Sequence, residues 1–142
     1  YLCQMTSMQA SLILDGLKYW KEQAEASRHI ATQYMQALEG KQDLIHIPPL
    51  PAGSFQTYLQ FPVWVSKSNG TLKRYLRGHQ VDINVDFFRD VSSLDCFSEY
   101  GRDCPNTQAL LNHLALLPTY PRQDRHYTER VTKSLEAFRI DP

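Results

Sequence analysis

The stretch CPNTQALLNHLALLPTYP, residues 104 to 121, decides how the second half of this chain folds. Pro105 suits the first turn of a helix, because the N–H that proline lacks would have no partner there. Leucines then recur at helical spacing and predict an inward-facing stripe: Leu110, Leu111 and Leu114. Leu116 and Leu117 predict a short buried strand that ends at Pro118. Because the helix runs directly into this strand, we expect the strand to lie beside two others.

Two segments upstream predict these neighbouring strands, because apolar side chains alternate in them with period two. The first covers residues 55 to 65, where Pro62 cannot donate a ladder hydrogen bond and therefore predicts a strand edge or a bulge. Its apolar face would carry Phe55, Thr57, Leu59, Phe61, Val63 and Val65. The second covers residues 81 to 87, and its apolar face would carry Val81, Ile83, Val85 and Phe87.

Further helices are predicted around these strands. A short helix runs from Thr71 to Arg77, and residues 89 to 103 predict an irregular loop. A last helix, from Asp124 to Arg139, buries an apolar stripe of Tyr127, Val131, Leu135 and Phe138. The order α–β–α–β–α–β–α indicates the α/β class, and 142 residues suit one domain.

The N-terminal segment predicts one long helix from Ser7 to Glu39. Thr6 and Gln9 have the spacing of a capping box, and Gly40 is a typical end signal. One face recurs at spacings of three and four: Ile13, Leu17, Trp20, Ala24, Ser27, Ala31, Tyr34 and Leu38. Such a helix would be roughly 50 Å long at 1.5 Å per residue. Two interpretations stay open: a core helix, or a helix that bridges to another domain or subunit.

Composition and charge exclude several classes of protein. Fifteen basic residues balance fifteen acidic ones, which argues against a nucleic-acid partner. No apolar run approaches the ~20 residues of a membrane span, and no signal peptide is visible. The cysteines have no paired spacing, so we expect reduced thiols in a cytoplasmic protein and no metal site: Cys3, Cys96 and Cys104. Because the chain begins with Tyr1 rather than methionine, we expect a piece of a longer protein.

Few residues suggest chemistry by themselves. Asp82, Asn84 and Asp86 would share one strand face, with their side chains about 7 Å apart. Such a face can serve acid–base chemistry or bind a cation. More often, polar residues in this pattern simply face the solvent. No glycine-rich phosphate loop is present. The residues alone therefore indicate an α/β module without its own catalytic machinery.

Four stretches in sequence resemble the small C-terminal domain of DegT/StrS-type aminotransferases. They are MTSMQASLILDGLKYWKEQAEASRHIATQYMQAL, QTYLQFPVWV, LRGHQVDINVDFF and CPNTQALLNHLALLPTYP. The first resembles the helix that opens that domain, and the last resembles its helix and Leu-Pro-x-x-Pro segment. The resemblance extends from residue 5 to about residue 138. It implies the α+β small domain of a fold-type I transferase, with an about three-stranded, mainly antiparallel sheet covered by helices.

The resemblance also implies an activity for a longer parent protein. Such enzymes use pyridoxal phosphate to move an amino group, typically from glutamate, to a keto sugar carried on a nucleotide, in surface-polysaccharide or amino-sugar synthesis. They are dimers with active sites at the subunit interface. The lysine that holds the cofactor would lie in an N-terminal large domain outside residues 1–142, so the isolated chain would bind no cofactor and be inert. None of this chain's own lysines is assigned that role: Lys18, Lys21, Lys41, Lys67, Lys73 and Lys133.

By position, the resemblance implies two groups of site residues. Tyr1 and Gln4 would lie near the cofactor, and Asn84, Asp86 and Phe87 near the substrate. The sequence departs from the family pattern at both places. Leu2-Cys3-Gln4 stands where the family usually has Asn-Tyr-Arg, and Asp86-Phe87 replaces His-Tyr. An alternative is therefore a degenerate, non-catalytic module for dimerisation or ligand binding. We also expect the isolated chain to self-associate through the long helix, with Trp20 and Tyr34 contributing.

Overall fold

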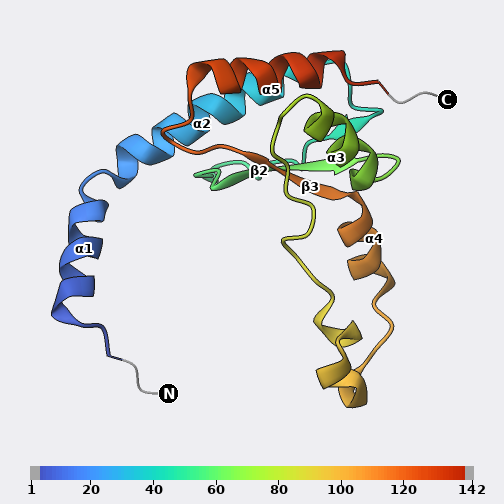
Figure 1. The fold of residues 1–142 in the computed structure, drawn as a ribbon, viewed down its shortest axis with the longest axis horizontal. Coiled ribbons are helices and arrows are strands. Elements are labelled where there is room, and N and C mark those ends of the chain that lie inside the picture. The colour runs from blue at the N-terminus through green and yellow to red at the C-terminus, as the bar shows by residue number, and fades with distance from the viewer. Residues whose placement is uncertain (1–3, 140–142) are drawn as a thin grey trace.

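A computed structural model describes residues 4–139 of the chain. Its helices are α1 (Ser7–Leu17), α2 (Trp20–Ala37), α3 (Asn69–Gly78), α4 (Pro105–His113) and α5 (Arg125–Ala137). Its strands are β1 (Ile45–His46), β2 (Gln60–Val65) and β3 (Leu114–Pro118). Two short 3-10 helices, η1 (Val91–Ser93) and η2 (Asp95–Tyr100), occupy the predicted loop. Figure 1 shows an arch, with α2, α5 and the sheet at its top.

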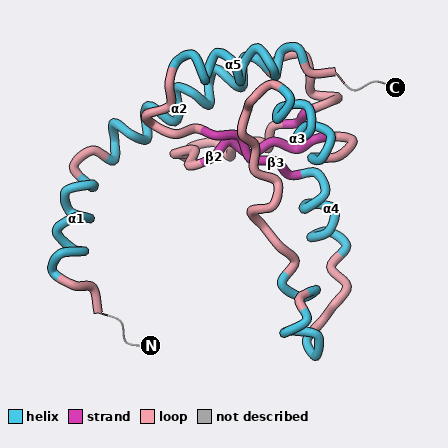
Figure 2. Tube along the Cα trace, viewed as in Figure 1, coloured by secondary structure: helices cyan, strands magenta, loops and turns pink. Residues whose placement is uncertain are grey.

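The strands form an antiparallel sheet in the order β1-β2-β3, which confirms the predicted sheet type. Phe61 pairs with Leu117 and Val63 with Ala115, so these side chains share one face. That face is fully buried under side chains from α2, α3 and α5, among them Tyr34, Leu72 and Val131. Figure 2 shows the strands beneath α2 and α5, with no helix across the middle of the other face.

The strand predicted over residues 81 to 87 is wrong as a full strand. Only Asn84 pairs with the sheet, through a bridge to Leu116 in which the N–H of each residue donates to the other's carbonyl, at 3.0 and 2.9 Å. Beyond the bridge, the Asn84 side-chain oxygen accepts the N–H of Asp86 at 3.2 Å, a local turn that ends the pairing. The third strand is instead β1, whose two residues are too few for a periodic signal.

The first predicted strand is shorter than expected, because residues 55 to 59 are not in the sheet. Tyr58 has a φ of 50°, in the left-handed region, and its carbonyl accepts the Thr119 hydroxyl at 2.6 Å. Pro62 lies in the central strand, where a missing donor would ordinarily be costly. It faces Leu116, whose backbone groups bond to Asn84 instead, and β1 pairs only with Trp64 and Val65. Pro62 therefore occupies a position where the ladder needs no donor.

The long N-terminal helix is broken into α1 and α2, so the prediction of one continuous helix is wrong. The capping box at Thr6 is confirmed. At the break, the N–H groups of Lys18 and Tyr19 bond three residues back, to Asp15 and Gly16, at 3.2 Å each. No residue of α1 is buried, so no core packing holds it in line with α2. Figure 1 shows α1 turning away from the body, and we call it the arm.

The predicted inward face holds only within α2 and its C-terminal end. Ala24, Ser27, Ala31, Tyr34 and Leu38 are buried. Ile13, Leu17 and Trp20 are about half exposed, at 49%, 54% and 47%. Because Tyr34 is completely buried, the expectation that it contributes to self-association is wrong.

The stretch from residue 104 to 121 folds as predicted in its main feature. Pro105 is the first residue of α4, and α4 passes directly into β3 without a loop. The side chain of Asn69, near the start of α3, donates to the carbonyls of Leu111 and Leu114, at 2.6 and 2.8 Å. These bonds satisfy carbonyls that the helix end leaves free. The inward stripe on α4 is wrong, because no residue of α4 is buried.

Candidate functional site

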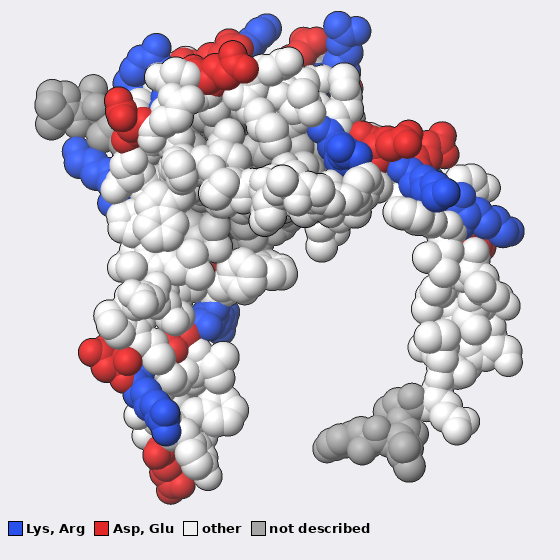
Figure 3. All heavy atoms as spheres, turned by 180° about the vertical axis from the view of Figure 1, so that it is seen from behind, with Lys and Arg blue, Asp and Glu red and all other residues white. Residues whose placement is uncertain are grey.

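The arch encloses a hollow between the arm and a second projection, residues 88–113, which we call the leg. Figure 3 shows this hollow from behind, with the arm largely free of charged side chains. The arm exposes large apolar residues along its length: Met8, Leu12, Ile13, Leu14 and Leu17. The leg does the same with Phe88, Val91, Leu94, Phe97, Tyr100 and Leu110. So much exposed apolar surface is typical of a face that meets another protein surface.

The segment from Asn84 to Phe87 lies at the base of the leg. Asn84 is held by its bridge to β3, which fixes where this segment leaves the sheet. A cavity of only about 10 Å³ lies beside it, between Val85, Phe88 and Leu116. The space is too small for a ligand, so any contact with one would be made by the exposed side of the segment.

Asp86 is fixed by an ion pair with α3. Lys73 Nζ lies 2.7 Å from its Oδ2, and the carboxylate is exposed whereas the Lys73 side chain is mostly covered. The hydrogen bond from Lys73 and then its charge hold the pKa of the Asp86 carboxyl below its usual value, with smaller contributions from Arg77 and Arg89. Asp86 is therefore ionised at neutral pH and offers a hydrogen-bond acceptor to the solvent.

Phe87 stands beside this carboxylate with 60% of its surface exposed. Its ring meets the Phe88 ring edge to face, with centroids 5.0 Å apart. An ionised acceptor next to an exposed aromatic face can bind a molecule that has hydroxyl groups on one side and an apolar face on the other.

The structure brings Asn84, Asp86 and Phe87 together and leaves Gln4 apart from them. Gln4 is exposed and precedes the Thr6 cap, at the free end of the arm. That end lies across the hollow from the leg (Figure 1). Tyr1 lies outside the described residues.

The described residues do not fit pyridoxal phosphate as a complete site. The lysine that holds this cofactor must have a free amine, and three of the lysines here are engaged elsewhere. Lys18 pairs with Asp15 at 2.8 Å and Lys73 with Asp86. Burial, and then Arg139, lower the pKa of Lys41, but its amine donates to the Phe138 carbonyl at 3.1 Å. Residues 4–139 also contain no cluster of three or more His, Cys, Asp or Glu side chains arranged to hold a metal ion.

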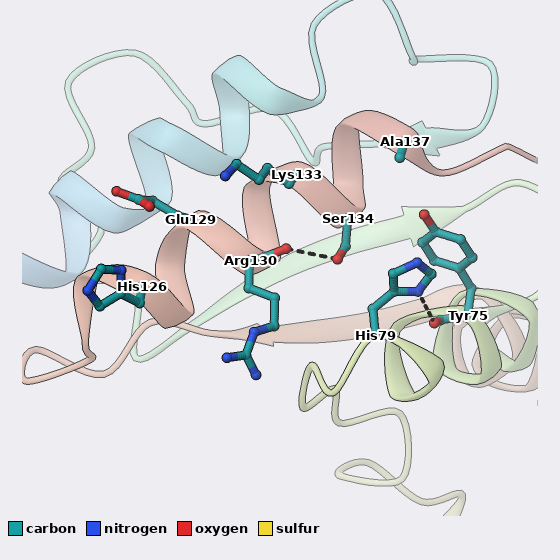
Figure 4. A pocket seen from close by; sticks show the side chains of 8 residues that line it. All are labelled: Tyr75, His79, His126, Glu129, Arg130, Lys133, Ser134 and Ala137. Carbon is teal, nitrogen blue, oxygen red and sulfur yellow. Dashed lines mark hydrogen bonds between the residues drawn. The ribbon is translucent and has the colours of Figure 1, made fainter.

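Sequence reasoning missed a larger cavity between α3 and α5, of about 520 Å³ (Figure 4). It is lined by Tyr75 from α3, by His79 directly after α3, and by His126, Arg130 and Lys133 from α5. The α5 residues recur at spacings of four and three, which is a signal that the sequence does contain. Nothing in the sequence places them against residues about fifty positions earlier.

Solved structures with the same fold come from aminotransferases. A DegT/DnrJ/EryC1/StrS aminotransferase from Brucella abortus matches with a TM-score of 0.77 and 20% identity, over 93% of this chain and 35% of that one. DesV from S. venezuelae, in complex with a ketimine intermediate, matches with a TM-score of 0.85 and 17% identity, over 97% of this chain and 38% of DesV. A sugar aminotransferase candidate from Streptococcus pneumoniae, in its PLP form, matches with a TM-score of 0.80 and 18% identity, over 96% of this chain and 36% of that one. The chain thus spans little more than a third of these proteins.

Two sequence comparisons and one property of the helices complete the description. No curated protein matches the chain. No helix within residues 4–139 has both the length and the hydropathy needed to cross a membrane. The family model of the DegT/DnrJ/EryC1/StrS aminotransferases matches residues 1–136, nearly the whole sequence. The chain therefore belongs to the DegT/DnrJ/EryC1/StrS aminotransferase family.

Proposed function

We propose that this chain is the C-terminal small domain of a cytoplasmic, dimeric aminotransferase that uses pyridoxal phosphate. The parent enzyme would move an amino group from glutamate to a keto sugar carried on a nucleotide, in surface-polysaccharide or amino-sugar synthesis. The observation that carries the proposal is the family match over residues 1–136. The solved structure in its PLP form supports the cofactor assignment.

The hollow would receive the N-terminal large domain of the same protein. Two observations support this assignment. The chain covers only 35% to 38% of the solved aminotransferases described above, so each of them has a further portion. The arm also exposes five large apolar side chains that make no core in the described residues: Met8, Leu12, Ile13, Leu14 and Leu17. Burying them would contribute about 25 cal/mol for each Å² of apolar surface removed from water.

Within the closed enzyme, this chain would supply one wall of the substrate cleft. Asp86 would accept hydrogen bonds from hydroxyl groups of the sugar, and Lys73 would hold that carboxylate in place. Phe87 would pack against the apolar face of the sugar ring. Asn84 would position both, because its bridge to Leu116 fixes the start of the segment. Gln4, at the end of the arm, would approach the cofactor, and so would Tyr1. The cofactor is the electron sink of the reaction. The lysine that binds it would come from the large domain.

The test is a visible absorption spectrum of the full-length parent with pyridoxal phosphate, recorded before and after the addition of glutamate. We expect a band from the bound cofactor that glutamate bleaches and a nucleotide-linked keto sugar restores. The isolated chain is the control and should give no such band. A folded parent without the band would contradict the proposal and favour a non-catalytic dimerisation or ligand-binding module.

A further inference from the structure

We propose that the groove between α3 and α5 binds a small organic anion that has a flat apolar body. The groove has a volume of about 520 Å³, which is in the range of small-molecule sites. It lies on the side of the molecule that carries α5, and the hollow lies on the other side of the sheet (Figure 1). The inference is therefore independent of the proposed aminotransferase function.

The positive charge of the groove is not neutralised by its own residues. Figure 4 shows Arg130 projecting from α5 between His126 and His79. Among the described residues its guanidinium has neutral partners: Gln80 Oε1 at 3.5 Å and the Tyr127 ring, whose centroid lies 6.0 Å away. Neither Arg130 nor Lys133 has a carboxylate within ion-pair distance among the residues that the structure describes. An arginine without a carboxylate partner keeps its planar set of donors available for an anion.

Glu129 is the carboxylate that lines the groove, and another residue already engages it. Its Oε1 accepts the Arg125 Nε–H at 3.0 Å, one turn earlier on α5. In Figure 4 the Glu129 side chain points away from Tyr75 and His79. The charge that a ligand would meet beside Arg130 is therefore positive.

One wall of the groove is aromatic and preorganised. The Tyr75 ring packs on His79, with centroids 4.3 Å apart, and meets Phe138 edge to face at 5.1 Å. His79 Nδ1 lies 2.9 Å from the Tyr75 carbonyl, which holds the imidazole in place. Ala137 lies opposite on α5 and leaves room beside this wall (Figure 4). We therefore expect a flat ring to pack against this wall, with its phosphate or carboxylate directed toward Arg130.

The probes are phenyl phosphate, inorganic phosphate and phenol, titrated into the ¹⁵N-labelled 142-residue chain and followed by NMR. Phenyl phosphate should shift amide signals of residues 75–79 and 130–137 in a saturable way. It should bind about fivefold more tightly than inorganic phosphate, because the ring adds packing on Tyr75. Phenol should cause no saturable shifts, because it lacks the charge.

Two variants and a matched control make the test specific. Arg130→Gln should weaken phenyl phosphate binding about tenfold, the scale of a lost charge-assisted hydrogen bond. Arg122→Gln removes the same charge from the loop before α5, away from this groove, and should change affinity less than twofold. Ala137→Phe should block binding by filling the space without changing any charge. Unchanged signals from the buried core will show that each variant is folded.

Three results would overturn the inference. Equal weakening by Arg122→Gln and Arg130→Gln would indicate diffuse attraction to the protein surface. Equal affinity for phenyl phosphate and inorganic phosphate would remove the role of the aromatic wall. Binding that survives Ala137→Phe would place the anion outside the groove.

Discussion

The hydroxyl of Tyr34 donates a hydrogen bond to the carbonyl of Pro118 at 2.8 Å and thereby ties the last turn of α2 to the end of β3. The same hydroxyl accepts a hydrogen bond from Gln123 Nε2 at 2.9 Å. The Gln123 amide also donates to Thr128 on α5, at 2.9 Å. A buried tyrosine therefore connects two helices and the sheet through one oxygen atom.

Removing this oxygen should destabilise the fold. Tyr34→Phe would leave the buried Pro118 carbonyl without its donor and one Gln123 bond without its acceptor. The Oε1 atom of Gln123 already lacks a partner within the described residues, so the substitution would add to the unsatisfied polar groups of this network. We expect a loss of about 1–3 kcal/mol in the free energy of unfolding, measured in urea.

Tyr100→Phe is the matched control, because Tyr100 is 75% exposed on the leg. It should change stability by less than about 0.5 kcal/mol. Equal effects of the two substitutions would contradict the structural role assigned to the Tyr34 hydroxyl.

The same tyrosine should make the fold sensitive to alkali. Burial raises the pKa of Tyr34 from its ordinary value of 10.0 to about 12, which the Gln123 hydrogen bond partly opposes. Because the unfolded chain loses this proton first, the free energy of unfolding should fall as the pH rises from about 10 to about 12. Stability measured across this range should decline less in Tyr34→Phe than in the unaltered chain. Burial also raises the pKa of Tyr127, so part of the decline should remain in the variant.

Lys73 should control the ionisation of Asp86. The direct bond between them lowers the pKa of the Asp86 carboxyl, so Lys73→Gln should raise it toward its usual value. An NMR titration of the side-chain carboxyl between pH 2 and 6 measures the change. Lys133→Gln removes the same charge from α5 and should leave the pKa of the Asp86 carboxyl unchanged. A pKa that does not respond to Lys73→Gln would show that the ion pair does not persist in solution.

The arm should drive self-association of the isolated chain. Leu12 and Leu14 are 68% and 65% exposed, so burying them against a second copy would remove apolar surface from water. Sedimentation should show oligomers in the unaltered chain, and Leu12→Glu should weaken association about tenfold without loss of stability. Ser11→Glu adds the same charge at an exposed neighbour and is the control. A monodisperse monomer at high concentration would contradict this prediction.

Sequence periodicity predicted those elements whose apolar side chains reach the core. The buried face of α2 and its C-terminal end, β2, and α5 all follow it, because each places a stripe or an alternating face against the same cluster. Periodicity was misleading in α1, where Ile13 and Leu17 continue the stripe without a core to enter. A pattern of apolar residues specifies burial but does not say whether the burying surface belongs to this domain.

Family resemblance and strand alternation both pointed to Asn84 and Asp86, but neither predicted how the chain holds them. Alternation predicted a strand to Phe87, but the turn made by the Asn84 side chain ends the pairing and moves Asp86 off the sheet. The ion pair with Lys73 and the groove beside Arg130 both join residues that are far apart in the sequence. Composition and spacing carry no information about such contacts.

The amide of Asn69 has a consequence for the order in which the chain folds. It supplies the donors that allow α4 to pass into β3 without a loop, yet it comes from a helix 42 and 45 residues earlier. Ordering the chain between them costs entropy before any contact is gained, which slows formation of such long-range junctions. The transition from α4 to β3 should therefore be completed only after α3 has docked, as a late event that depends on both halves of the chain.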